Sequence, residues 1–220
     1  MGKILENKKK KKERLLEAAY ELFTAEGVEN TSISDIARRA LVAKGTFYLY
    51  FKDKYEIERH LIASKSNEII ASAFKEAMKK KIPSNKENVF FIINYIIDFL
   101  ASDPKLLTFI SKNLSWGVFT EAIFNDSEEN VLDYEKLVNV LIYDVRVNDG
   151  EINEISDLSK LEFDTSNVKY KDVDIMIYTI FELVSSTCYN IILNEKPTTL
   201  KSYKPYLFGL IEAILKQHEI

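Results

Sequence analysis

Residues 44–51 combine side chains suited to binding nucleic acid with side chains suited to anchoring a short helix. They read Lys-Gly-Thr-Phe-Tyr-Leu-Tyr-Phe. Phe47 and Phe51 are four residues apart, so on a helix they share one face, which we predict points inward. Gly45 has no side chain and lets the backbone approach a phosphate closely. The side chains left to face outward, toward phosphates and base edges, belong to Lys44, Gly45, Thr46, Tyr48 and Tyr50.

No other pattern in the chain predicts catalysis or a cofactor. His60 and His218 lie far apart, without Cys or paired carboxylates at ligand spacing, so no metal site is expected. Nucleophile motifs, a glycine-rich phosphate loop and a dinucleotide fingerprint are absent from the sequence. Cys188 cannot form an intrachain disulfide, and the N-terminus has the lysine run 8–12 where a signal peptide would be apolar. We therefore predict a cytoplasmic protein that is not an enzyme and has no cofactor.

Three short helices are predicted to position residues 44–51. Apolar residues recur at helical spacing over residues 13–26. Ser32 and Asp35 form a capping-box signature that opens a second helix at 34–40. After a three-residue turn, the third helix runs over 44–50. Two short helices joined by a tight turn are typical of a helix-turn-helix, whose second helix enters the major groove.

The rest of the chain is predicted to be helical. Six Gly and four Pro in 220 residues are too few for the turns of an all-β fold. Helices are expected at 54–80, 85–101, 104–113, 128–147, 171–194 and 203–217, with a helical turn at 118–124 and a loop at 148–168. We predict an all-α protein with a helix-turn-helix domain at 1–53, including a basic tail at 1–12, and a larger helical ligand-sensing and dimerisation domain at 54–220.

Charge is distributed unevenly along the chain. The net charge is −4, but residues 1–60 carry +3 and residues 61–220 carry −7. A basic head on an acidic body suits a protein that contacts phosphate with one end only. The lysine run is either a solvated tail or an arm along the DNA backbone or minor groove.

Residues 10–56 resemble the DNA-binding domain of the TetR family. The resemblance covers about a fifth of the chain and rests on Ala18-Ala19-Tyr20-Glu21-Leu22-Phe23, Gly27-Val28, Thr31-Ser32-Ile33-Ser34-Asp35-Ile36-Ala37 and Lys44-Gly45-Thr46-Phe47-Tyr48-Leu49-Tyr50-Phe51-Lys52-Asp53-Lys54. It implies a ligand-responsive transcriptional regulator. Such a protein is expected to be a repressor that binds a palindromic operator as a dimer and is released by a small, mostly apolar effector.

The resemblance also implies a role for eight positions. Thr31 or Ser32 would donate to a phosphate, Lys44 would reach a phosphate or a base edge, Gly45 and Thr46 would lie against bases, Tyr48 and Tyr50 would hold the backbone through their hydroxyls, and Lys54 would bind a phosphate.

The two C-terminal helices, at about 171–194 and 203–217, are predicted to form a homodimer. Their apolar faces would pair with those of a second copy in a four-helix bundle, as in the resembled family. Two recognition helices would then lie one DNA turn apart, about 34–36 Å. The residues assigned to this interface are Val173, Ile177, Ile180, Phe181, Val184, Leu207, Leu210, Ile211 and Ile214.

Two positions depart from the family pattern, and they support an alternative. Leu41 stands where the family usually has Gly, and Ala43 where it has Ser or a similar residue before the lysine. A leucine in a left-handed turn costs roughly 1 kcal/mol, and a lost N-cap costs about as much, so a differently built turn stays open. The alternative is a helical ligand-binding or scaffold protein whose head does not bind DNA productively. Activation rather than repression also stays open, because a fold does not fix the sign of regulation.

Overall fold

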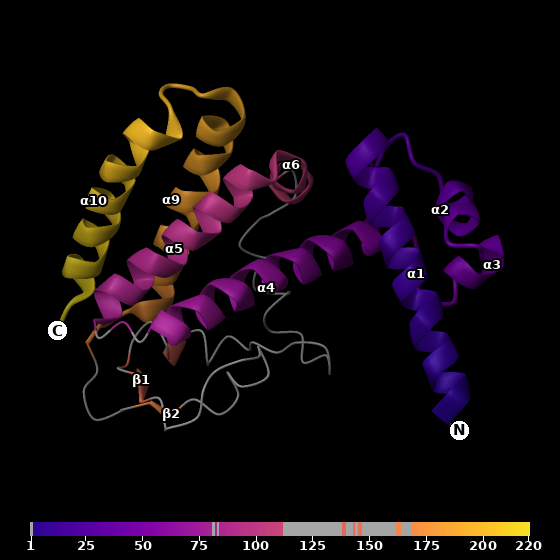
Figure 1. Cartoon of the computed structure of the whole chain (residues 1–220), viewed down its shortest axis with the longest axis horizontal. Helices are drawn as coiled ribbons and strands as arrows, with labels where there is room; N and C mark the ends of the chain where they lie inside the picture. The colour runs from indigo at the N-terminus through magenta and orange to yellow at the C-terminus, as the bar shows by residue number, and fades with distance from the viewer. Residues whose placement is uncertain are drawn as a thin grey trace. The chain divides into compact units, whose positions relative to one another are not determined.

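The computed structural model of the chain describes residues 2–80, 82, 84–111, 138–139, 143, 145–146, 162–163 and 169–220. The predicted all-helical fold with a three-helix N-terminal part is confirmed (Figure 1). The elements are α1 (Gly2–Glu26), α2 (Ile33–Arg39), α3 (Lys44–Phe47), α4 (Lys54–Lys80), α5 (Asn85–Ser102), α6 (Pro104–Ser111), β1 (Val145–Arg146), β2 (Glu162–Phe163), α9 (Val173–Asn194) and α10 (Leu200–His218).

Three predicted segments lie wholly or largely outside the described residues: the helical turn at 118–124, the helix at 128–147 and the loop at 148–168. Where the second of these is described, its end was predicted wrongly. Val145–Arg146 is a strand that pairs antiparallel with Glu162–Phe163, with Val145 opposite Phe163. A pairing partner distant in sequence leaves no trace in local helical periodicity, which is why the helix was extended too far.

The chain divides into two compact units, Met1–Ser64 and Lys65–Ile220, so the boundary falls within α4. In the first unit α1 packs on α2, and α2 packs on α3. Leu15 and Ala19 of α1, Ile36 of α2 and Phe47 of α3 are completely buried and form its core. Gly27, with a φ of +85°, ends α1 in the left-handed conformation that suits glycine.

Helix α1 begins at Gly2, eleven residues before the predicted start at residue 13, so the predicted basic tail forms its first turns. Lysine and glutamate are good helix formers. Lys10 also forms an ion pair with Glu6, one turn away, at 2.7 Å. The lysine run 8–12 therefore forms a helical, solvent-facing extension of α1.

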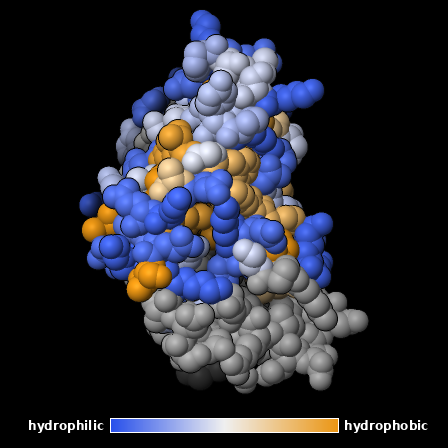
Figure 2. Space-filling model, turned by 90° about the vertical axis from the view of Figure 1, so that its left-hand side faces the viewer, coloured by the Kyte–Doolittle hydropathy of each residue, from blue (hydrophilic) through white to orange (hydrophobic). Residues whose placement is uncertain are grey.

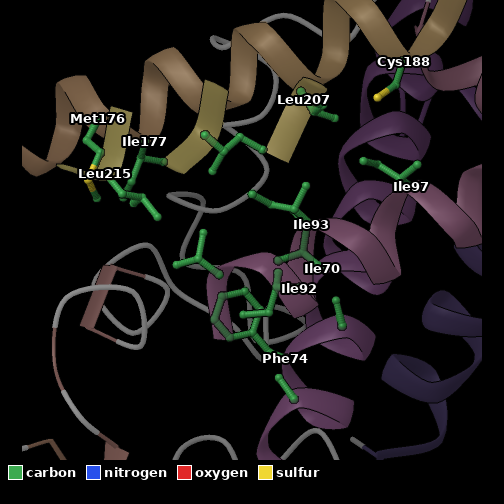
Figure 3. Close-up of a cluster of buried hydrophobic side chains, with 14 of the residues drawn as sticks. Ile70, Phe74, Ile92, Ile93, Ile97, Met176, Ile177, Cys188, Leu207 and Leu215 are labelled. Atoms are coloured by element: carbon green, nitrogen blue, oxygen red, sulfur yellow. The ribbon is translucent and has the colours of Figure 1, made fainter. Parts of the chain in front are cut away.

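The second unit is a packed group of helices around a largely aliphatic core. α10 packs on α9 and α5, and α6 packs on both α9 and α5. Figure 3 shows the side chains of α4 and α5 facing those of α9 and α10. The labelled core residues are Ile70, Phe74, Ile92, Ile93, Ile97, Met176, Ile177, Cys188, Leu207 and Leu215.

Candidate nucleic-acid interface and interior cavity

Two phenylalanines hold α3 against the first unit. Phe47 and Phe51 are 0% and 4% exposed, and their ring centroids lie 5.8 Å apart. Phe47 also meets Tyr48 edge-on at 5.6 Å, and the Phe51 ring lies 6.1 Å from that of His60. The N–H of Phe51 donates to the carbonyl of Phe47, which extends the helical turn beyond the last residue of α3. Both predicted anchors are therefore buried.

The outer side of α3 presents polar groups to solvent. Lys44 and Gly45 are exposed, Tyr48 is 54% exposed, and Thr46 and Tyr50 are half-buried. A Cβ atom placed on Gly45 would meet nothing within 4 Å, and the backbone there is not left-handed. Nothing in the described part of the chain thus requires a glycine at this position. A glycine here leaves the backbone open to close approach by another molecule, which is a physical reason for this residue type at position 45.

The turn between α2 and α3 keeps a left-handed residue even though that residue is leucine. Leu41 has a φ of +54°, and its side chain is 82% exposed. Its N–H donates to the carbonyl of Arg38, and the N–H of Val42 donates to that of Ala37. Ala43 is the N-cap of α3 and makes no side-chain capping bond. The turn therefore keeps the left-handed residue at position 41. It also keeps both expected energetic costs, the backbone strain of Leu41 and the missing side-chain cap at Ala43.

Arg14 braces this turn, a role that the sequence did not reveal. Its guanidinium donates to the carbonyl of Ala40 and, at 3.1 Å, to that of Leu41. These carbonyls lie at the end of α2, where backbone acceptors lack helical partners. A cation there also interacts favourably with the helix dipole. Arg14 is 26 residues from Ala40, so no local motif could have predicted the contact.

Lys54 opens α4 as predicted, and its ammonium forms hydrogen bonds within the first unit. Its ammonium donates to three carbonyls between α1 and α2: Val28 at 2.8 Å, Glu29 at 3.1 Å and Thr31 at 3.4 Å. An ammonium has three protons, so these bonds use its full capacity. Only 19% of the side chain is exposed. This geometry favours a positioning role, in which Lys54 ties the start of α4 to the loop before α2.

The structure separates the two residues offered as alternatives at the start of α2. Thr31 is 2% exposed, and its hydroxyl donates to the carbonyl of Gly27 at 2.9 Å. Ser32 is exposed and caps α2, with its hydroxyl accepting from the N–H of Asp35 at 3.1 Å. The Ser32 hydroxyl and N–H donate to the Asp35 carboxylate, and these bonds lower the pKa of Asp35. Of the two residues, Ser32 is exposed and Thr31 is buried.

An apolar cavity of about 360 Å³ lies within the second unit. Its described walls come from α4, α5, α6, α9 and α10. Most lining side chains are aliphatic, such as Ile70 of α4, Ile93 of α5 and Ile177 of α9, and Figure 3 shows these three in the cluster. A cavity of this size lies at the low end of the range for small-molecule sites, about 300–1,000 Å³.

α9 and α10 also expose apolar side chains. Ile175 and Tyr178 of α9 are 61% and 45% exposed, and Tyr206 and Leu210 of α10 are 74% and 49% exposed. We call these four residues the α9–α10 face. Figure 2 shows apolar residues at several places on this side of the second unit, with hydrophilic residues among and around them. An apolar patch with a polar rim is typical of a protein–protein contact.

Three of the residues predicted to form the dimer interface were assigned wrongly. Ile177, Leu207 and Ile211 are 6%, 0% and 0% exposed, because they pack inside the second unit. α9 and α10 each carry apolar residues on more than one face. Periodicity identifies the faces and cannot tell which of them covers the chain's own core.

Sequence comparison gives relatives for the first part of the chain. Residues 15–60 match the family model described as bacterial regulatory proteins, tetR family. A curated HTH-type transcriptional regulator of Staphylococcus aureus strain USA300 is 33% identical over 99 residues, which are 45% of this chain and 52% of the relative. The chain thus spans about half the length of the curated relatives it matches.

Structural comparison extends the likeness over most of the chain. The fatty acid degradation regulator FadR of Bacillus halodurans aligns with a TM-score of 0.56 at 18% identity, over 90% of this chain and 96% of its own. FadR of Bacillus subtilis, solved in complex with stearoyl-CoA, aligns with a TM-score of 0.55 at 23% identity over the same shares. At these identities the likeness establishes the fold alone.

Proposed function

We propose that this chain is a transcriptional repressor that a small effector releases from DNA. The starting point is the match of residues 15–60 to the tetR family of bacterial regulatory proteins. It would bind a palindromic operator as a dimer. The observation that carries the proposal is α3, a short helix anchored by Phe47 and Phe51 with Lys44 and Gly45 exposed. Residues 1–53 would form the DNA-binding domain and residues 54–220 the sensing and dimerisation domain.

The DNA contacts would come from α3 and from the start of α2. Ser32 would exchange its bond to Asp35 for a phosphate, and the α3 residues would enter the major groove. Thr31 and Lys54 would act indirectly, since their polar groups already bond to carbonyls within the chain. The contact residues that we propose are Ser32, Lys44, Gly45, Thr46, Tyr48 and Tyr50.

The α9–α10 face would be covered by a second copy of the chain. Judged by length and composition alone, α9 could cross a membrane, and 28% of its most apolar 18-residue stretch is buried within the structure. Its contacts with α6 and α10 are those of a helix packed in a globular unit. We therefore propose a cytoplasmic homodimer, in which two heads reach successive major grooves about 34–36 Å apart.

The cavity of the second unit would hold the effector. Its aliphatic walls favour a mostly apolar molecule. The FadR structure that contains stearoyl-CoA supports this proposal, because a protein of the same fold binds a molecule with a long hydrocarbon chain. To release DNA, the effector need only bind the non-binding arrangement more tightly by a few kcal/mol.

Fluorescence anisotropy with labelled DNA from upstream of the chain's own gene tests the proposal. The full chain should bind with a Kd that rises steeply with salt. Lys44→Ala should weaken binding and reduce the slope of log K against log salt by about 0.9 for each lost phosphate contact, or about 2 for a dimer. Thermal stability should not change, because Lys44 is exposed.

Lys105→Ala is the matched control, since Lys105 is also an exposed lysine near a helix start but lies in α6. It should leave DNA binding and its salt slope unchanged. Equal effects of the two substitutions would contradict the assignment of α3 as the recognition helix. Absent or salt-independent binding by the unmodified chain would favour the alternative, a helical ligand-binding or scaffold protein with an inactive head.

A further inference from the structure

Ser66 is a buried serine whose hydroxyl lacks a hydrogen-bond partner within the described residues. It lies inside α4 and is 7% exposed. A hydroxyl within a helix commonly donates to the carbonyl four residues earlier. Thr24 and Thr187 do so, to Tyr20 and Leu183 at 2.7 and 2.5 Å. Ser66 makes no such bond, nor any other within the described residues.

The unpartnered hydroxyl lies at the wall of the apolar cavity. Ser66 lines it together with Ile69, Ile70 and Phe74, which fall on the same face of α4. Burial of a polar group without a partner destabilises a protein, and a ligand that supplies the partner removes that cost. The described wall is mainly aliphatic, and Ser66 is the one of its polar residues that is buried with an unpartnered hydroxyl; the others are Ser111, Glu182, Ser185, Ser186 and Tyr189. This composition resembles small-molecule sites, in which a few polar groups orient a mainly apolar ligand.

The charge of the cavity wall limits the ligand further. Glu182 is the one charged residue among the described lining residues, and it carries a carboxylate. Cys188 also lines the cavity, and burial raises the pKa of its thiol to about 11, so it stays neutral. No lining residue that the structure describes is a lysine or an arginine. A buried anion would therefore lose its hydration without gaining a counter-ion.

We infer that Ser66 is the polar anchor of the effector site, and that the effector is an uncharged, mainly hydrocarbon molecule with one hydroxyl or carbonyl group bonded to Ser66 Oγ. This inference rests on the proposed function, because it names the ligand class of the cavity proposed there. The volume of about 360 Å³ accommodates one such molecule.

The test compares three probes on the full chain by thermal shift and calorimetry: 1-decanol, decanoate and n-butylbenzene. 1-Decanol should bind, and decanoate should bind at least tenfold more weakly because its charge is not compensated. Ser66→Ala should weaken 1-decanol binding about fivefold to tenfold, which corresponds to the loss of one hydrogen bond. Binding of n-butylbenzene, which has no polar group, should stay the same.

Ser66→Ala should also raise the melting temperature of the unliganded protein, because it removes a buried hydroxyl without a partner. Ser72→Ala makes the same chemical change in α4 outside the cavity lining and should alter neither binding nor the response to the probes. Equal losses for 1-decanol and n-butylbenzene, absent 1-decanol binding, or tighter decanoate binding would each overturn the inference. DNA binding is measured separately, so its absence alongside Ser66-dependent 1-decanol binding would reject only the proposed repressor function.

Discussion

Replacing Leu41 with glycine should stabilise the turn that positions α3. The left-handed backbone of Leu41 costs roughly 1–2 kcal/mol for a residue with a Cβ and nothing comparable for glycine. Its side chain is 82% exposed, so deleting it loses only a few tenths of a kcal/mol of apolar burial. Glycine also has more freedom in the unfolded chain, which costs about 0.5–1 kcal/mol. Leu41→Ala has the same loss of burial and keeps the left-handed strain.

The informative quantity is therefore the difference between the two variants. Leu41→Gly should be about 1 kcal/mol more stable than Leu41→Ala, which corresponds to about 4–8 °C in the transition that reports the first unit. Calorimetry and urea unfolding followed by circular dichroism measure it. The same pair of substitutions at Leu49, which is 75% exposed and not left-handed, provides the control, because there glycine should be the less stable variant. A Leu41→Gly protein no more stable than Leu41→Ala would refute the reasoning.

Three further predictions follow from other contacts. Lys54→Met should destabilise the first unit by about 2 kcal/mol, because three carbonyls lose a charged donor; an unchanged urea midpoint would argue against the positioning role. Tyr206→Glu should shift the chain from dimer to monomer in analytical ultracentrifugation. Lys201→Glu, which also changes an exposed residue of α10, is the control and should leave the dimer intact. A Tyr206→Glu variant that stays dimeric would place the interface elsewhere. The hydrogen bonds from Ser32 lower the pKa of Asp35 in the folded protein below its ordinary value of 3.8. The ionised Asp35 therefore stabilises the fold at pH values above 3.8, and this stabilisation is lost as the pH falls through the folded-state pKa. The difference in melting temperature between the unmodified chain and Asp35→Asn should then shrink on acidification, and a constant difference would contradict this assignment.

Local capping signals in the sequence predicted the start of α2 well. The capping box of Ser32 and Asp35 is present as predicted, and Asp103 accepts from the N–H of Leu106 at the start of α6. Side-chain caps act over three residues, so the sequence contains all the information they need. Ser84 precedes α5 but makes no capping bond, so a serine before a helix does not by itself predict a cap.

Features that depend on distant partners were not predictable. The contact of Arg14 with the end of α2 and the capture of Lys54 by three carbonyls both join residues more than twenty positions apart. The sequence showed a lysine at the spacing expected for a phosphate contact. It did not show the three carbonyls that accept hydrogen bonds from this lysine in the structure. Likewise, the apolar residues of α9 and α10 could be recognised, whereas their division between core and surface could not.

The lysine run of α1 makes the length of that helix sensitive to its ionic surroundings. Successive helical residues are rotated by about 100°, so five consecutive lysines surround the helix and share a rise of about 6 Å. Their mutual repulsion opposes the first turns, and bound counterions or a polyanion relieve it. Helical content at the N-terminus should therefore increase with ionic strength, whereas the DNA binding proposed above would weaken under the same conditions. If the lysine run acts as the DNA arm, the ordering of this segment and its binding to the phosphate backbone would respond to salt in opposite directions.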